Sequence, residues 1–139
     1  MIFKGEKMAY DKNAMKYIAP VWELDTEKQT VKHTDETTLE VSEEYFHQEC
    51  VRYHLKYVAE HCPEKLQTLV NSGEILEYLD KLIDDVIDAM DSQVEKWKAV
   101  DKDYQAAILN NDYYEQAAIL NRMDMQAKEI VYPELVYTI

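Results

Sequence analysis

The sequence has few of the residues that interrupt regular structure. Glycine occurs twice and proline three times in 139 residues. Because these two residues mark most tight turns, their scarcity predicts long helices joined by few loops. Apolar residues make up 47% of the chain, which argues against global disorder. The length is that of one ordinary domain.

Long apolar runs are also missing. No stretch approaches the roughly 20 apolar residues of a membrane span, and the segment from Met1 to Glu6 lacks the apolar run of a signal peptide. The two cysteines, Cys50 and Cys62, fall on one predicted helix about 18 Å apart, too far for a disulfide. We therefore expect a cytoplasmic protein with two reduced thiols and no membrane partner.

Sequence patterns typical of catalysis are absent as well. The chain has three serines, of which Ser42 and Ser72 fit helix ends. No nucleophile elbow, glycine-rich phosphate loop or CxxC pattern is present. We therefore expect a non-enzymatic protein with no catalytic residue and no cofactor.

Two groups of residues have the composition of metal sites. The segment Asp84–Asp88 matches the DDxxD pattern of enzymes that bind a magnesium diphosphate. Its two middle residues belong to an apolar stripe, so we interpret the aspartates as the solvated back of a helix. The side chains of His47, Cys50, His54 and His61 lie on or near one helical face, but no second helix offers a ligand for zinc. We expect no metal at either place.

Helix signals become regular after residue 41. Ser42, followed by acids that suit the first turn, predicts the start of a helix that runs to about Cys62. Pro63 fits the first position of a second, short helix, and Gly73 fits its left-handed end. A third helix is predicted from about Glu74 to Ala99. Its apolar stripe consists of Ile75, Leu76, Leu79, Leu82, Ile83, Val86, Ile87, Met90, Val94 and Trp97.

The last third of the chain contains a small repeat. Residues 105–110 recur as residues 116–121, an offset of eleven that presents the same helical face twice. Either one helix runs from Tyr104 to Val131, or it breaks at Asn110 and Asn111. Asp112 would recap the second piece, so we favour a break. Pro133 is expected to end the helix, and the apolar tail after it is expected to pack.

Residues 1–41 are less regular and contain only short β-branched segments, which predict an extended arm or a small hairpin. We therefore predict an all-α fold: a small helical bundle of four to five helices with a short extended or hairpin N-terminal segment. In this reading residues 1–41 are an extended or irregular arm packed on an acidic helical bundle at 42–139, within a single domain.

Charge is the strongest functional signal. The net charge is −13, and residues 74–101 alone carry nine acids against three lysines. Such a field repels phosphate backbones and attracts basic surfaces. The junction at Gly73 has the outline of a helix-turn-helix, but acids would meet the phosphates, so direct nucleic-acid binding is not expected. The predicted partner-binding residues are Glu77, Asp80, Asp84, Asp85, Asp88, Asp91 and Glu95.

Several motifs together resemble the transposon-encoded protein TnpV family. The similarity is best over Tyr53–Met90, with a Pro-capped short helix, a Ser-Gly turn and a Leu-rich acidic helix in order. It returns at Ala127–Val131 and Glu134–Thr138, and Tyr17–Pro20 is similar to the family's N-terminal Tyr-x-x-Pro element. The resemblance implies an accessory role in the movement of a mobile genetic element, and it supplies no catalytic residue.

These observations lead to one expected function and two alternatives. The expected function is a non-enzymatic accessory protein that binds a protein partner with a basic surface through an acidic helical face. The first alternative is a phage- or element-borne anti-defence inhibitor that acts as an acidic nucleic-acid mimic. The second is a DNA-binding excision factor. A homo-oligomer also remains open, because the apolar stripe of the third helix is long.

Overall fold

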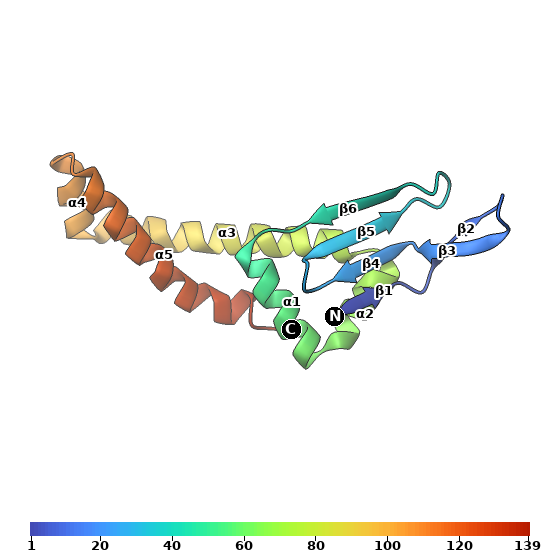
Figure 1. Ribbon diagram of the computed structural model, residues 1–139. Coiled ribbons are helices and arrows are strands. Elements are labelled where there is room, and N and C mark those ends of the chain that lie inside the picture. The colour runs from blue at the N-terminus through green and yellow to red at the C-terminus, as the bar shows by residue number, and fades with distance from the viewer.

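The computed structural model describes residues 1–139 and shows an α+β protein, with six strands followed by five helices (Figure 1). The strands are β1 (Ile2–Lys4), β2 (Met8–Asp11), β3 (Lys16–Pro20), β4 (Trp22–Asp25), β5 (Thr30–Thr34) and β6 (Val41–Tyr45). The helices are α1 (Glu49–His61), α2 (Pro63–Ser72), α3 (Ile75–Val100), α4 (Lys102–Leu109) and α5 (Tyr113–Leu135). The predicted all-α bundle is therefore wrong, although five helices are present.

Four strands form an antiparallel sheet in the order β1-β4-β5-β6, and β2 pairs with β3 in a separate hairpin that projects from its end (Figure 1). One register row pairs Phe3 with Leu24 and Leu24 with Val31. All three side chains are buried, so this row belongs to the face that packs on the helices. The sheet was missed because its strands have only three to five residues, too few for a clear alternating pattern, and because β1 pairs with β4 rather than with the next strand in the sequence.

The outer face of the sheet carries a row of charged side chains. Its central register row runs Lys4, Glu23, Lys32, Glu43 from β1 to β6, so that opposite charges alternate across all four strands. Lys32 and Glu43 form an ion pair of 3.9 Å. Opposite charges that face each other on neighbouring strands stabilise a sheet, and the row therefore helps to set the register.

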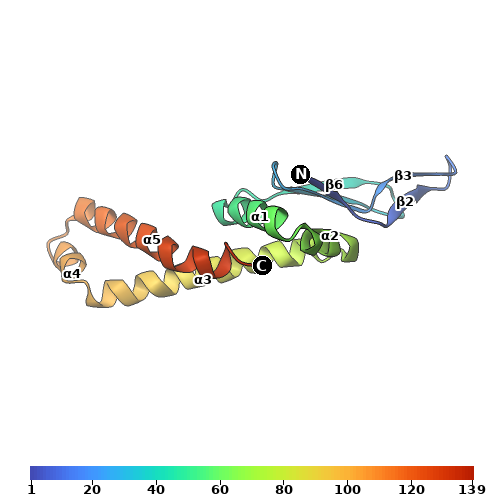
Figure 2. The same cartoon turned by 90° about the horizontal axis from the view of Figure 1, so that it is seen from below.

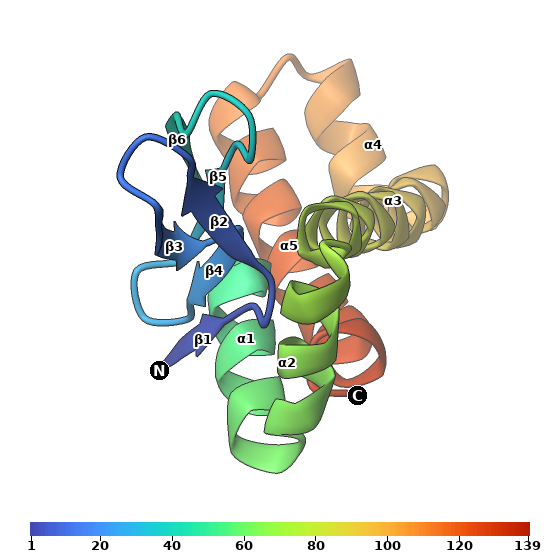
Figure 3. The same ribbon diagram turned by 90° about the vertical axis from the view of Figure 1, so that its right-hand side faces the viewer.

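The helices lie on one side of the sheet (Figures 2 and 3). Helices α1 and α2 pack directly beneath it, and α3 packs on their far side. This arrangement encloses a core of 18 buried residues, which includes Leu24 from the sheet, Leu55 from α1, Leu66 from α2 and Leu79 from α3. The sheet and the first three helices thus share one hydrophobic core.

The far half of α3 leaves this body and forms a long arm with α4 and α5 (Figure 2). A second, smaller core of four buried residues holds the arm together: Val94, Ile119, Met123 and Ala127. The other end of α5 returns to α1, where Glu49 accepts hydrogen bonds from Lys128 and Tyr132 at 3.2 and 3.3 Å. The predicted break at Asn110 is confirmed, since α4 and α5 are separate helices.

Three predicted helix ends are confirmed by their local geometry. Pro63 is the first residue of α2, and Gly73 ends that helix with a left-handed backbone at φ 77°. A side chain at Gly73 would also collide with Trp22, since a Cβ there would lie 2.7 Å from the indole Nε1. Asp112 caps the start of α5, where its carboxylate accepts a hydrogen bond from the Glu115 amide. Local signals were sufficient at these positions.

Two other predicted ends are wrong. Ser42 does not cap a helix: it lies within β6, and α1 begins only at Glu49. The reason is long-range, because residues 41–45 pair with β5 and Phe46 enters the core before the helix starts. Pro133 does not end α5, which continues to Leu135. Pro133 lies in the last turn and is exposed, where the loss of one helical hydrogen bond is tolerated.

The predicted free thiols are confirmed, and the predicted packing of the C-terminal tail is confirmed for its first part. Val136 is fully buried in the main core, whereas Tyr137, Thr138 and Ile139 are exposed. Cys50 is buried, Cys62 is half-buried, and neither forms a disulfide. Burial raises the pKa of the Cys50 thiol, which makes it a weak nucleophile. None of the helices is both long and apolar enough to span a bilayer.

Candidate functional site: an acidic row on helix α3

Six of the predicted partner-binding acids form a continuous line along α3, which we call the acidic row. Its members are Glu77, Asp80, Asp84, Asp88, Asp91 and Glu95. Their spacing of three or four residues keeps them within an arc of about 80° on a helix with 3.6 residues per turn. At 1.5 Å per residue the row is about 27 Å long. The buried residues of α3, such as Leu79 and Val86, lie on the opposite side, so the row faces solvent.

All six members of the acidic row are exposed. Five of them have no lysine or arginine nitrogen within 4.0 Å, and only Glu95 has a partner, Lys98 at 3.1 Å. The seventh predicted residue, Asp85, is half-buried and lies beside the row. Its carboxylate pairs with Lys81 at 2.6 Å. The acidic row is therefore not neutralised from within the molecule.

The two lysines beside the row remain charged. A side-chain hydrogen bond to Asp85 raises the pKa of Lys81, and a hydrogen bond to Glu95 raises the pKa of Lys98. Lys81 pairs with Asp85 and Lys98 pairs with Glu95, so neither lysine forms an ion pair with the five unpaired carboxylates. Carboxylates of this kind accept hydrogen bonds from incoming ammonium or guanidinium groups.

The DDxxD pattern is split between the row and its flank. Asp84 and Asp88 belong to the acidic row, whereas Asp85 is turned toward Lys81. No group of three or more His, Cys, Asp or Glu side chains converges as a metal site would require. The structure therefore gives this segment the arrangement of a solvated acidic face.

The other candidate ligands are also dispersed. His54 is buried, and both ring nitrogens are used within the protein. His61 stacks on Tyr57 with ring centroids 4.2 Å apart and bonds to the Tyr57 carbonyl. His47 is exposed beside Tyr45. These rings are occupied by packing or lie apart, and none of them shares a metal-ligand cluster with Cys50.

The environment of His54 was not predicted from the sequence. Its Nδ1 lies 2.7 Å from the Val136 carbonyl, which can only accept, so Nδ1 carries the proton. Its Nε2 then accepts from the Tyr78 hydroxyl at 2.6 Å. Burial lowers the pKa of His54, and the ring stays neutral. This chain of bonds ties α1, α3 and the C-terminal tail together, and no local pattern signals it.

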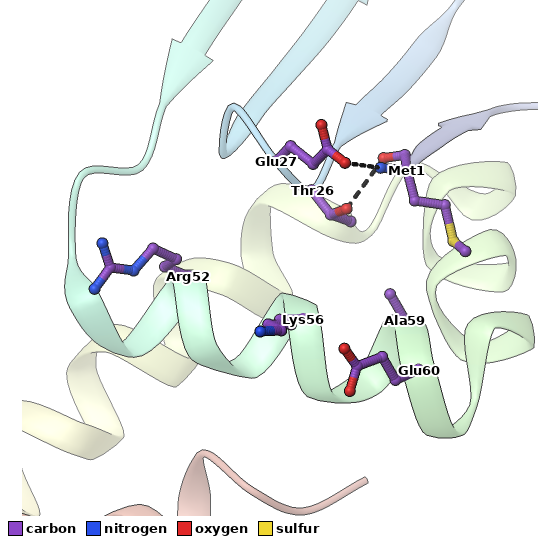
Figure 4. A pocket seen from close by; sticks show the side chains of 7 residues that line it. All are labelled: Met1, Thr26, Glu27, Arg52, Lys56, Ala59 and Glu60. Carbon is purple, nitrogen blue, oxygen red and sulfur yellow. Dashed lines mark hydrogen bonds and ion pairs between the residues drawn. The ribbon is translucent and has the colours of Figure 1, made fainter.

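The largest hollow in the surface lies elsewhere, between α1 and the turn that joins β4 to β5 (Figure 4). Its volume is about 630 Å³. Its wall mixes charges: Arg52, Lys56 and Glu60 come from α1, and the Met1 amine pairs with Glu27 at 3.6 Å. Arg52 lies at the opposite end from Met1 and points away from it (Figure 4). The lining residues do not converge on a common point, so the hollow lacks the arrangement of a catalytic site.

The turn between α2 and α3 differs from a free helix-turn-helix. Gly73 lies against the Trp22 side chain, so the turn is covered by the sheet. The exposed opening of α3 carries Glu74, Glu77 and Asp80. A helix with this surface meets phosphates with like charge.

Comparisons of the chain with protein-family models, with curated proteins and with solved structures each found no match. The resemblance to the TnpV family therefore stays a prediction from the sequence motifs.

Proposed function

We propose that this chain is a non-enzymatic accessory protein that binds a basic surface of a protein partner through the acidic row of α3. The supporting observation is the run of five exposed carboxylates without an ion-pair partner. A partner with matching lysines or arginines supplies the missing counter-charges and is steered to the row by its field. The sequence resemblance supports a role in the service of a mobile genetic element, and we infer that the protein acts in the cytoplasm.

An anti-defence inhibitor that mimics nucleic acid is the second candidate, because the acidic row is long and straight. The charge density of the acidic row distinguishes the two candidate functions. Six carboxylates over about 27 Å give one charge per roughly 5 Å, whereas duplex DNA carries one charge per about 1.7 Å. The row is sparser than the ligand it would imitate, so we place the protein-binding role first.

The test uses a defined cationic probe, a fluorescent oligolysine peptide, with binding followed by anisotropy at low and moderate salt. A row variant carries Asp80→Asn, Asp84→Asn, Asp88→Asn and Asp91→Asn. We expect the probe to bind the row variant roughly tenfold more weakly than the wild type, from four exposed charge contacts of about 0.2–1 kcal/mol each. The wild-type affinity should also fall with salt.

A matched control separates the row from net charge. The control variant carries Glu40→Gln, Glu60→Gln, Glu129→Gln and Glu134→Gln, four exposed acids outside α3 with no ion-pair partner. It changes the net charge by the same amount and should keep most of the affinity. Equal losses in both variants would show that the row is no site. If the wild-type protein retards duplex DNA in a gel-shift assay, the result would favour the DNA-binding alternative instead.

A further inference from the structure

The strand β6 forms an open edge of the sheet. All five of its residues, Val41–Tyr45, are exposed, and β5 pairs with only one side of it. In Figure 1, β6 is the outermost strand of the sheet. The other sheet edge, β1, has only three residues. An unpaired edge of this length presents backbone N–H and C=O groups that can bind a further strand.

The charges of the sheet specify what such a strand must carry. The outer row alternates Lys4, Glu23, Lys32 and Glu43, and it stops on a carboxylate at the open edge. The next position in that row is complementary to a cation. On the opposite face, Glu44 continues the row of Leu24 and Val31 and is exposed. A strand beside β6 therefore meets one carboxylate on each face.

The same carboxylates oppose pairing between two copies of this chain. Residues that lie opposite each other in an antiparallel pair point to the same face of the sheet. A pair of β6 strands centred on residue 43 therefore places Glu43 against Glu43 of the second copy, and a pair centred on residue 44 places Glu44 against Glu44. Like charges directly opposite each other destabilise a strand pair. The chain itself has no two adjacent basic residues that could serve as the missing strand.

We propose that β6 accepts an extended segment of a partner protein with two adjacent lysine or arginine residues. These two residues point to opposite faces, where they pair with Glu43 and Glu44. Apolar neighbours in the segment contact Val41 and Tyr45, which are each 62% exposed at the ends of the strand. Backbone hydrogen bonds supply the affinity, and the two cations set the register.

This site is separate from the acidic row. The proposal requires no residue of α3, and the row variant described above leaves β6 unchanged. Failure of one site therefore does not decide the other, because the row variant removes four charges of the row and keeps β6 intact.

The experiment titrates the row variant with a seven-residue peptide of valine and threonine that has two central lysines. Hydrogen exchange is measured residue by residue. We expect saturable, salt-sensitive binding and slower amide exchange within residues 41–45. A peptide with the same charges but N-methylated backbone amides should not bind. Absence of binding at millimolar peptide, or binding without protection of β6, would overturn the proposal.

Charge reversal gives an independent check. The variant Glu43→Lys, Glu44→Lys should bind the lysine peptide about tenfold more weakly or worse, since two cross-strand pairs become repulsive. It should gain affinity for a peptide with two central glutamates. The control Glu40→Lys lies outside the strand and should behave as the parent. If the reversed strand does not fold, Glu43→Gln with Glu44→Gln replaces it and should lose the preference between the two peptides. Equal affinity of all variants for both peptides would refute the proposal.

Discussion

At the scale of single residues, the most constrained polar group is His54. Its ring is enclosed by three elements, and both of its nitrogens have a partner. The Val136 carbonyl requires a proton on Nδ1, and the Tyr78 hydroxyl donates to the bare Nε2. A protonated ring would have two donors, and Tyr78 would have to turn its hydroxyl around. The folded protein therefore favours the neutral imidazole, as its lowered pKa indicates.

This preference predicts a pH dependence of stability. The unfolded chain binds a proton at His54 below about pH 6.5, whereas the folded chain resists it. The unfolded state then holds more protons, so the free energy of unfolding falls as the pH drops below this value. The variant His54→Gln offers similar hydrogen bonds without a titrating ring. We expect the wild type to lose more stability than this variant between about pH 7 and 5, by up to about 1.4 kcal/mol per pH unit.

Urea unfolding at a series of pH values measures this difference. The other three histidines are present in both proteins and cancel in the comparison. Parallel stability curves for the wild type and the variant would contradict the assignment of a neutral ring.

At the scale of elements, the two hydrophobic cores are unequal. The body has a core of 18 buried residues, whereas the arm has four. Burial of apolar area contributes roughly 25 cal/mol per Å², so far less free energy holds the arm together than the body. We therefore expect helix α4 and the adjoining end of α5 to be less stable than the body.

A substitution in the arm core should destabilise only the arm, whereas a substitution in the main core should also destabilise the sheet. Met123→Ala creates a cavity in the arm core and should lower the local stability of α4 and α5 by about 2–5 kcal/mol. Leu55→Ala removes a fully buried side chain from the main core and should destabilise the sheet as well. Native-state hydrogen exchange distinguishes the two: Met123→Ala should speed exchange in the arm and leave β4 and β5 unchanged. Equal acceleration in both regions would show that the chain unfolds as one unit.

The same contrast explains what the sequence could and could not predict. The ends at Pro63, Gly73 and Asp112 depend on the backbone geometry of a few neighbouring residues, so local signals sufficed. The sheet depends on pairing between Phe3 and Leu24, and the start of α1 depends on the burial of Phe46; both are contacts that no short window contains. Ser42 followed by two glutamates imitates a helix start, and only pairing with β5 overrides it.

The candidate site was predictable to a similar degree. The spacing of the acids along α3 is a periodic signal, so the sequence already placed them on one face. Their lack of partners depends on distant cations. Arg122 of α5, for example, pairs with Asp101 at 3.1 Å and does not reach the acidic row. Such pairings follow from the fold and could not be anticipated.

At the scale of the whole molecule, the charge is poorly compensated. The net charge is −13, and the structure contains seven ion pairs, one of them made by the terminal amine. Excess charge of one sign destabilises a folded state by self-repulsion. The elongated shape, with the arm extending away from the sheet (Figure 2), places part of the charge at a distance from the rest.

Salt should therefore stabilise this protein. Raising the ionic strength from about 0.01 to 0.1 M shortens the screening length from about 30 to 10 Å, which weakens repulsion between distant carboxylates. We expect the melting temperature in calorimetry to rise by a few degrees. The row variant should have a higher melting temperature than the wild type at low salt, and its melting temperature should rise less when salt is added. A melting temperature that falls with added sodium chloride would show that the seven ion pairs outweigh the repulsion.

The long helix α3 belongs to both the body and the arm, since Leu79 packs in one core and Val94 in the other. Helix α5 also joins the two halves, since Met123 packs in the arm core and Val131 in the main core, so the outer surface of α3 runs along one of two helices that connect them. A protein that binds along the full length of α3 also opposes bending of this helix. The mobility of α4 and of the adjoining end of α5 then depends on whether a partner is bound to α3.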